Sequence, residues 1–93
     1  MISLPRTNPR ICVLGLGYVG LPLAVAFGVH HDTLGYDLDA GRIAELRQGK
    51  DRTLEVDAEE ISGSENLRFS ADPADLGDCN VFVVTVPTPI DNA

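Results

Sequence analysis

The 93-residue sequence predicts an α/β fold in which a parallel sheet is doubly wound, with helices packed on its faces. Short apolar segments rich in β-branched residues alternate with segments whose apolar residues recur at helical spacing. An unbroken apolar segment, Val81–Val86, is typical of a strand buried on both faces of such a sheet. Because crossovers between parallel strands are right-handed, we expect the four strands in the order 3-2-1-4.

The predicted elements alternate along the chain as strand, helix, strand, with short connections. Residues 1–8 are expected to form a flexible tail and residues 9–93 the domain. Strands are predicted at residues 10–14, 33–36, 67–70 and 81–86. Helices are predicted at residues 19–28, from residue 39 to just before Gly49, near residues 58–61 and from Pro73 to about Gly77, with Asp39 and Asp72 as N-caps.

A glycine motif joins the first predicted strand to the first predicted helix. In Gly15-x-Gly17-x-x-Gly20, the first glycine allows a tight turn, the second leaves room for phosphates and the third allows close packing of the helix. Asp37 follows at the end of the second strand, 22 residues after Gly15. This context, and not the glycines alone, predicts a Rossmann-type site that holds a dinucleotide pyrophosphate at a helix N-terminus.

Asp37 is expected to accept hydrogen bonds from the adenosine ribose, because Asp39 is better placed to cap the second helix. A carboxylate at this position repels a 2′-phosphate, so we expect NAD and not NADP as the cofactor. Arg42 has three open interpretations: it tolerates a 2′-phosphate, stacks on adenine or is an ordinary surface arginine. The cofactor-binding set includes it.

Three further residues belong to the predicted cofactor site. Tyr18, inside the glycine loop, either lines the pyrophosphate site or packs over the turn, and Val19 follows it at the start of the helix. Thr88 lies beyond the carboxyl end of the fourth strand, where ligands bind in such sheets, whereas Thr85 is interpreted as a strand residue.

Composition and charge exclude several other classes of function. The net charge is −7, with ten of the fourteen acidic residues between Asp51 and Asp91, so nucleic acid and anionic membranes are not expected partners. No secretory signal is recognisable in residues 1–10, and we expect a cytoplasmic protein with no membrane span. Cys12 and Cys79 are interpreted as reduced core thiols. No catalytic set and no metal cluster is recognised.

Four segments together resemble the N-terminus of the UDP-glucose/GDP-mannose 6-dehydrogenase family. They are Ile11–Leu23 (ICVLGLGYVGLPL), Gly35–Leu46 (GYDLDAGRIAEL), Gly49–Val56 (GKDRTLEV) and Val81–Asp91 (VFVVTVPTPID). The sequence is most similar to the UDP-N-acetylhexosamine branch, including the Vi-polysaccharide type. The glucose branch usually has Asn-Thr-Pro-Thr after the fourth strand, whereas this chain has Pro87-Thr88-Pro89-Ile90.

The resemblance implies an enzyme of polysaccharide biosynthesis that oxidises the C6 alcohol of a UDP-N-acetylhexosamine to a carboxylate and reduces two NAD in turn. In the family, the catalytic cysteine, lysine, asparagine and aspartate lie far beyond position 93. The 93 residues alone are therefore expected to be inactive, and a full-length parent is expected to bind a UDP-sugar and to form a homo-oligomer. A UDP-glucose 6-dehydrogenase, a non-catalytic NAD-binding module and a methyltransferase are the alternatives.

The fourth strand has one further consequence. A fifth strand would normally flank residues 81–86, which form an apolar segment without charge or proline. Such an edge pairs readily with another chain. We therefore expect the 93-residue chain to self-associate through this strand, unless a tail segment covers it.

Overall fold

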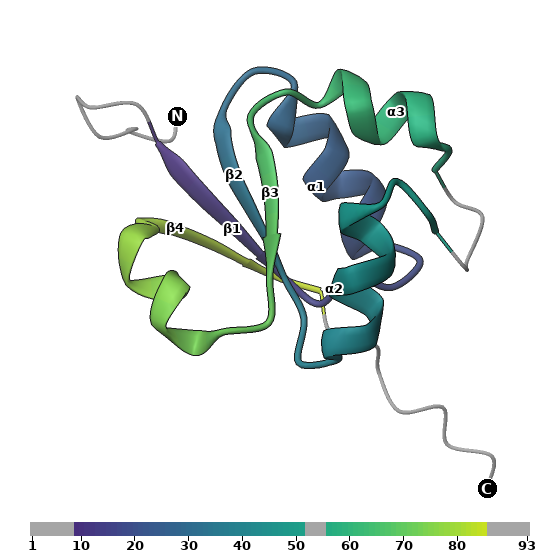
Figure 1. The fold of residues 1–93 in the computed structure, drawn as a ribbon. Coiled ribbons are helices and arrows are strands. Elements are labelled where there is room, and N and C mark those ends of the chain that lie inside the picture. The colour runs from purple at the N-terminus through teal and green to yellow at the C-terminus, as the bar shows by residue number, and fades with distance from the viewer. Residues whose placement is uncertain (1–8, 52–55, 86–93) are drawn as a thin grey trace, which may run out of the picture.

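The computed structural model describes residues 9–51 and 56–85. These residues contain one parallel sheet whose strands run in the order β3-β2-β1-β4. The strands are β1 (Arg10–Leu14), β2 (Asp32–Tyr36), β3 (Leu67–Ser70) and β4 (Val81–Val84). The predicted α/β class and strand order are therefore confirmed (Figure 1).

Helical segments connect the strands and cover the two faces of the sheet unequally. Figure 1 shows the three α-helices on one side of the sheet and the 3₁₀ helix η1 on the other. Their bounds are α1 (Gly20–Gly28), α2 (Ala40–Arg47), α3 (Ala58–Gly63) and η1 (Pro73–Asp78). The sheet is thus doubly wound, but its second face has much less cover than its first in the described part of the chain.

Polar side chains fix where α2 and α3 begin; the cap of α2 was predicted from the sequence, and the cap of α3 was not. Asp39 accepts hydrogen bonds from the backbone N–H groups of Gly41 and Arg42 at the start of α2. Asp57 and Glu60 form a reciprocal capping box at the start of α3. Each cap satisfies N–H groups that have no partner inside the first helical turn.

The main hydrophobic core lies between the sheet and α1 and α2. Its buried members include Leu21 and Ala24 of α1 and Ile43 and Leu46 of α2, packed with strand residues of the same face. A smaller cluster of Cys12, Leu34 and Tyr36 lies on the opposite face and contacts Leu14, Leu76 and Cys79. Both cysteines are free thiols, and Cys12 is fully buried.

The expectation that both faces of the fourth strand are buried is wrong. Val81 and Val83 pack against the main core, but Phe82 is 50% exposed and Val84 is 62% exposed on the other face. The physical reason is that η1 is a short helix, and among the described residues no other helix covers this face.

The parallel register brings the carboxyl ends of three strands to the same edge of the sheet. Leu14 at the end of β1 pairs with Tyr36 at the end of β2 and with Val84 at the end of β4. The chain leaves β1 and β2 directly into the glycine motif and Asp37, so the two predicted parts of the cofactor site meet at this edge. None of the described helices is long and apolar enough to cross a membrane.

Candidate functional site

The turn after β1 has the backbone conformation that its first glycine was predicted to allow. Gly15 has a φ of 97°, a conformation that residues with a Cβ atom rarely adopt. Its N–H donates to the carbonyl of Tyr36 at 2.8 Å, which holds the turn against the end of β2. The glycine loop is therefore tied to the sheet at its first residue.

Gly20, the first residue of α1, lies against this turn. A Cβ atom at position 20 would lie 1.7 Å from the carbonyl oxygen of Gly15 and 2.3 Å from Oγ1 of Thr85. Real Cβ atoms do not approach other atoms this closely, so α1 can begin where it does only if position 20 is glycine. The predicted close packing of the helix is confirmed, and the immediate contact of Gly20 is the carbonyl of Gly15, the first residue of the turn.

The N-terminus of α1 offers a set of unused hydrogen-bond donors. The N-cap residue Val19 makes no side-chain cap bond. Within the described residues, the N–H groups of Gly17, Tyr18, Val19 and Gly20 donate to no protein acceptor. The position that a Cβ atom of Gly17 would take has no atom within 4 Å. Free N–H groups beside open space at a helix N-terminus suit an anionic phosphate, so the residues present fit a dinucleotide.

The side chains of the loop point outward. Tyr18 is 70% exposed and Val19 is 68% exposed. The interpretation that Tyr18 packs over the turn is therefore wrong. Its alternative role, lining the pyrophosphate site, stays a prediction, as does the contact of Val19 with the cofactor.

Asp37 lies next to the glycine loop, as predicted. Its Oδ2 accepts a hydrogen bond from the N–H of Leu16 at 2.9 Å, and its Oδ1 accepts one from the N–H of Asp39 at 2.9 Å. A carboxylate has about four acceptor positions, so it can also accept from ribose hydroxyls. The role of Asp39 as the cap is confirmed, and the ribose contact of Asp37 stays a prediction.

Arg42 is not an ordinary surface arginine, because only 5% of it is exposed. Its Nε and Nη2 donate to the carbonyl of Leu16 at 3.0 and 2.7 Å. Its Nη1 forms an ion pair with Oδ1 of Asp51 at 2.7 Å. The sequence pattern places Arg42 on α2 but does not reveal this contact with the loop; a contact with the cofactor stays a prediction.

Thr85 contributes to the site, although the sequence analysis treats it as a strand residue. Its hydroxyl lies 2.7 Å from the carbonyl oxygen of Gly15 and 3.2 Å from that of Leu14. The Thr85 hydroxyl therefore donates to the carbonyl of Gly15, the same carbonyl that Gly20 contacts at the start of α1. The place of Thr85 near the carboxyl end of the predicted fourth strand, where ligands bind in such sheets, is the sequence signal that could have indicated this. Thr88, the predicted cofactor contact, lies outside the described residues.

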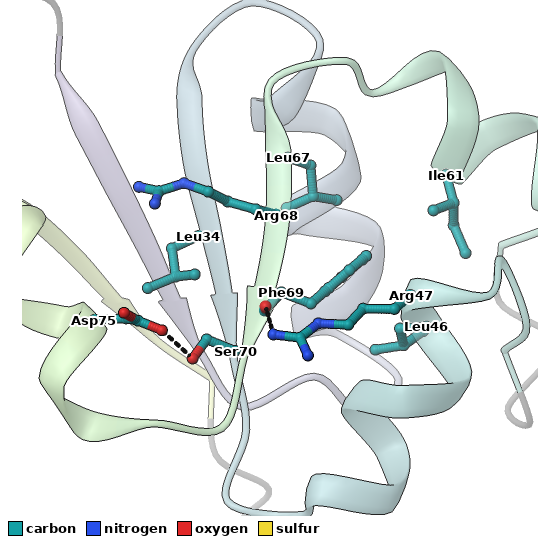
Figure 2. A pocket seen from close by; sticks show the side chains of 9 residues that line it. All are labelled: Leu34, Leu46, Arg47, Ile61, Leu67, Arg68, Phe69, Ser70 and Asp75. Atoms are coloured by element: carbon teal, nitrogen blue, oxygen red, sulfur yellow. Dashed lines mark hydrogen bonds between the residues drawn. The ribbon is translucent and has the colours of Figure 1, made fainter.

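A hollow of about 500 Å³ lies elsewhere, at the outer border of β3 (Figure 2). Figure 2 shows Arg47 donating to the carbonyl of Phe69, at 2.8 Å, and Ser70 bonded to Asp75. None of the residues that line this hollow belongs to the predicted cofactor site. It contains no group that points to a ligand, and we assign it no function.

The two cysteines are poor candidates for a nucleophile, as their positions in the sequence indicate. Burial raises the pKa of the Cys12 thiol to about 12, with the neighbouring Cys79 as a further cause. Burial also raises the pKa of Cys79. Both thiols are therefore protonated at neutral pH, and a protonated thiol does not attack a carbonyl carbon.

Replacing Gly20 by alanine tests the close contact at the start of α1. Because the backbone carbonyl of Gly15 cannot move away cheaply, we expect Gly20→Ala to lower the free energy of unfolding by about 1–3 kcal/mol. Chemical denaturation monitored by circular dichroism measures this change. Gly17→Ala is the matched control, since nothing lies near its added methyl group. Equal stability of the two variants would contradict the argument.

Comparison with known proteins shows the family to which the chain belongs. Residues 9–93 match the family model described as the NAD binding domain of the UDP-glucose/GDP-mannose dehydrogenase family. The UDP-N-acetyl-D-glucosamine 6-dehydrogenase of Pseudomonas aeruginosa is 60% identical over 88% of this chain and 19% of its own length. A protein of the same name from Salmonella typhi is 44% identical over 87% of this chain and 19% of its own length.

Solved structures of dehydrogenases are also similar to this chain. The UDP-D-ManNAc dehydrogenase of Pyrococcus horikoshii is 36% identical with a TM-score of 0.77, over 88% of this chain and 21% of that one. The GDP-mannose dehydrogenase of Pseudomonas aeruginosa is 28% identical with a TM-score of 0.78, over 89% of this chain and 20% of that one. The chain spans roughly a fifth of the length of these relatives. It belongs to the UDP-glucose/GDP-mannose dehydrogenase family and matches the NAD binding domain of that family.

Proposed function

We propose that this chain is the NAD-binding part of an enzyme that oxidises the C6 alcohol of a UDP-N-acetylhexosamine to a carboxylate. The observation that carries the proposal is the set of N–H groups at the start of α1 that have no acceptor among the described residues, with the carboxylate of Asp37 beside the same loop. The relative that is 60% identical carries the name UDP-N-acetyl-D-glucosamine 6-dehydrogenase, which supports this substrate class over UDP-glucose.

Each part of the site has a distinct task in this function. NAD, when bound, supplies the nicotinamide ring that accepts a hydride. The N–H groups of residues 17–20 bind the pyrophosphate, and the dipole of α1 adds to their attraction for its charge. Asp37 binds the ribose hydroxyls and disfavours a 2′-phosphate. This part of the chain therefore binds and orients the cofactor, and the substrate site is expected in residues beyond these 93.

We also infer a cytoplasmic location. Two free thiols, one fully buried and one partly buried, support a reducing compartment. In the longer protein, homo-oligomerisation remains part of the proposal.

The complete gene product that contains this chain should reduce NAD with a UDP-N-acetylhexosamine. We expect two NADH for each sugar, measured by absorbance, because oxidation from alcohol to carboxylate removes four electrons. UDP-glucose at the same concentration is the control and should react more slowly. A protein that binds NAD but oxidises no UDP-sugar would instead support a non-catalytic NAD-binding module. Binding of S-adenosylmethionine in preference to NAD would support a methyltransferase.

Substitution of Asp37 tests its role in the choice between NAD and NADP. We expect Asp37→Ala to weaken NAD binding by about 1–3 kcal/mol, the range for a hydrogen bond to a charged group, and to weaken NADP binding less. Asp37→Asn removes the charge and keeps an acceptor for only one of the N–H groups of Leu16 and Asp39, so it loses fewer hydrogen bonds than Asp37→Ala. Titration calorimetry with both cofactors measures the affinities.

Asp32→Ala is the control for this series. Asp32 lies at the opposite end of β2, where it pairs with Arg68 at 3.6 Å on the surface, so its removal should leave both affinities unchanged. If Asp37→Asn prefers NAD over NADP as strongly as the parent protein does, the carboxylate does not set the selectivity.

The outer border of β4 supports a second proposal, that the 93-residue chain self-associates. β4 is the last strand of the sheet and pairs only with β1 among the described residues. The exposed side chains of Phe82 and Val84 add an apolar surface beside its unpaired backbone groups. Exposed apolar edge strands of this kind pair with other chains.

Phe82→Lys should reduce this self-association, because a charge beside the strand opposes the approach of a second apolar edge. Light scattering over a range of concentrations measures the molecular mass. Leu38→Lys is the matched control, since Leu38 is also apolar and is 84% exposed but lies outside β4. A chain that stays monomeric at high concentration would contradict the proposal.

A further inference from the structure

Leu16, in the middle of the glycine loop, is held through both of its backbone groups. Its N–H donates to Oδ2 of Asp37 at 2.9 Å. Its carbonyl oxygen accepts two hydrogen bonds from the guanidinium of Arg42, at 3.0 and 2.7 Å. The side chain of Leu16 is 1% exposed, so the residue is anchored in the core as well.

The hydrogen bonds from Arg42 to the Leu16 carbonyl also set the direction of the N–H group of Gly17. The carbonyl of Leu16 and the N–H of Gly17 belong to one peptide plane, and no cis peptide bond occurs among the described residues. In a trans peptide these two groups point in opposite directions. Arg42 therefore draws the carbonyl inward and turns the N–H of Gly17 away from itself, where residues 9–51 and 56–85 provide no acceptor for it.

Arg42 needs a partner of its own, because a buried cation without one is strongly unfavourable. Asp51 is that partner: its Oδ1 lies 2.7 Å from Nη1, and the side chains of Arg42 and Asp51 are 6% and 0% exposed. The second oxygen of Asp51 accepts the N–H of Val56 at 3.1 Å. Asp51 is thus fixed in position by the segment that leads into α3.

We propose that Asp51 is a positioning residue of the dinucleotide site. Through Arg42 it fixes the Leu16 carbonyl, and through that peptide plane it directs the N–H of Gly17 toward the pyrophosphate. This inference rests on the proposed NAD binding and deepens it. It makes a residue far from the glycine motif in the sequence a determinant of pyrophosphate affinity, and Asp51 need not touch the cofactor.

The experiment compares ligands with and without a pyrophosphate. In the complete gene product, Asp51→Asn keeps the size of the side chain but removes the charge that orients Arg42. We expect NAD and ADP to bind about tenfold more weakly by titration calorimetry, the equivalent of one charged hydrogen bond. Adenosine, which lacks the pyrophosphate, should bind as in the parent protein when titrated by NMR.

A control separates this effect from a loss of stability. Asp57→Asn weakens the capping box of α3, close to Asp51 in the sequence, and the hydrogen bond that the Asp57 side chain accepts within the described residues belongs to this box. We expect it to lower the melting temperature and to leave the NAD affinity unchanged. A purely structural role of Asp51 would give the same pattern in Asp51→Asn, which would overturn the proposal.

Arg42→Lys is a second variant in case Asp51→Asn does not fold. Lysine retains the buried ion pair with Asp51 but cannot present two donors to the Leu16 carbonyl in the same fork. This variant should bind NAD and ADP more weakly than the parent protein and should bind adenosine with the same affinity. An equal loss of affinity for adenosine and for ADP would overturn the proposal, because it would show that Arg42 acts on the adenosine part of the cofactor. A parent protein that binds no NAD would instead contradict the proposed function.

Discussion

The contact between Gly20 and the carbonyl of Gly15 is the constraint on which the rest of the site depends. It sets where α1 starts relative to the end of β1, and therefore where the N–H groups at the start of this helix lie. The hydroxyl of Thr85 holds the same carbonyl, so β4 takes part in this arrangement. The start of α1 and the distant Thr85 thus meet at one peptide group of the turn, and the position of the anion site follows from this contact.

The location of the site could be predicted from the sequence because its determinants are local. The spacing of Gly15 and Gly20, and Asp37 at the end of a strand, depend on backbone geometry that is the same in every sheet of this type. The burial of Arg42 could not be predicted, because its partners Leu16 and Asp51 come from segments 26 residues before it and 9 residues after it. The exposure of Phe82 depends likewise on which helices cover the sheet, and a single strand does not contain that information.

The charge distribution explains how an acidic protein can bind an anionic cofactor. The net charge is −7, so the long-range field opposes the approach of a pyrophosphate. Arg42 and Asp51 form a buried pair whose charges compensate each other, and Asp37 adds a negative charge beside the loop. Attraction must therefore come from the oriented N–H groups and the dipole of α1, which act over short distances. Affinity in such a site depends on geometry more than on net charge.

The two edge strands of the sheet, β3 and β4, differ in whether their outward backbone groups are already hydrogen-bonded, and this difference bears on the symmetry of an assembly. At the outer border of β3, Arg47 donates a hydrogen bond to the carbonyl of Phe69, which is one of the acceptors that an added strand would need. The border at β4 has no such cover among the described residues. In the self-association proposed above, two copies would therefore join through β4 on both sides, and such an arrangement would have a twofold axis and close on itself. Head-to-tail addition, which could continue into a filament, would instead require that Arg47 release the carbonyl of Phe69.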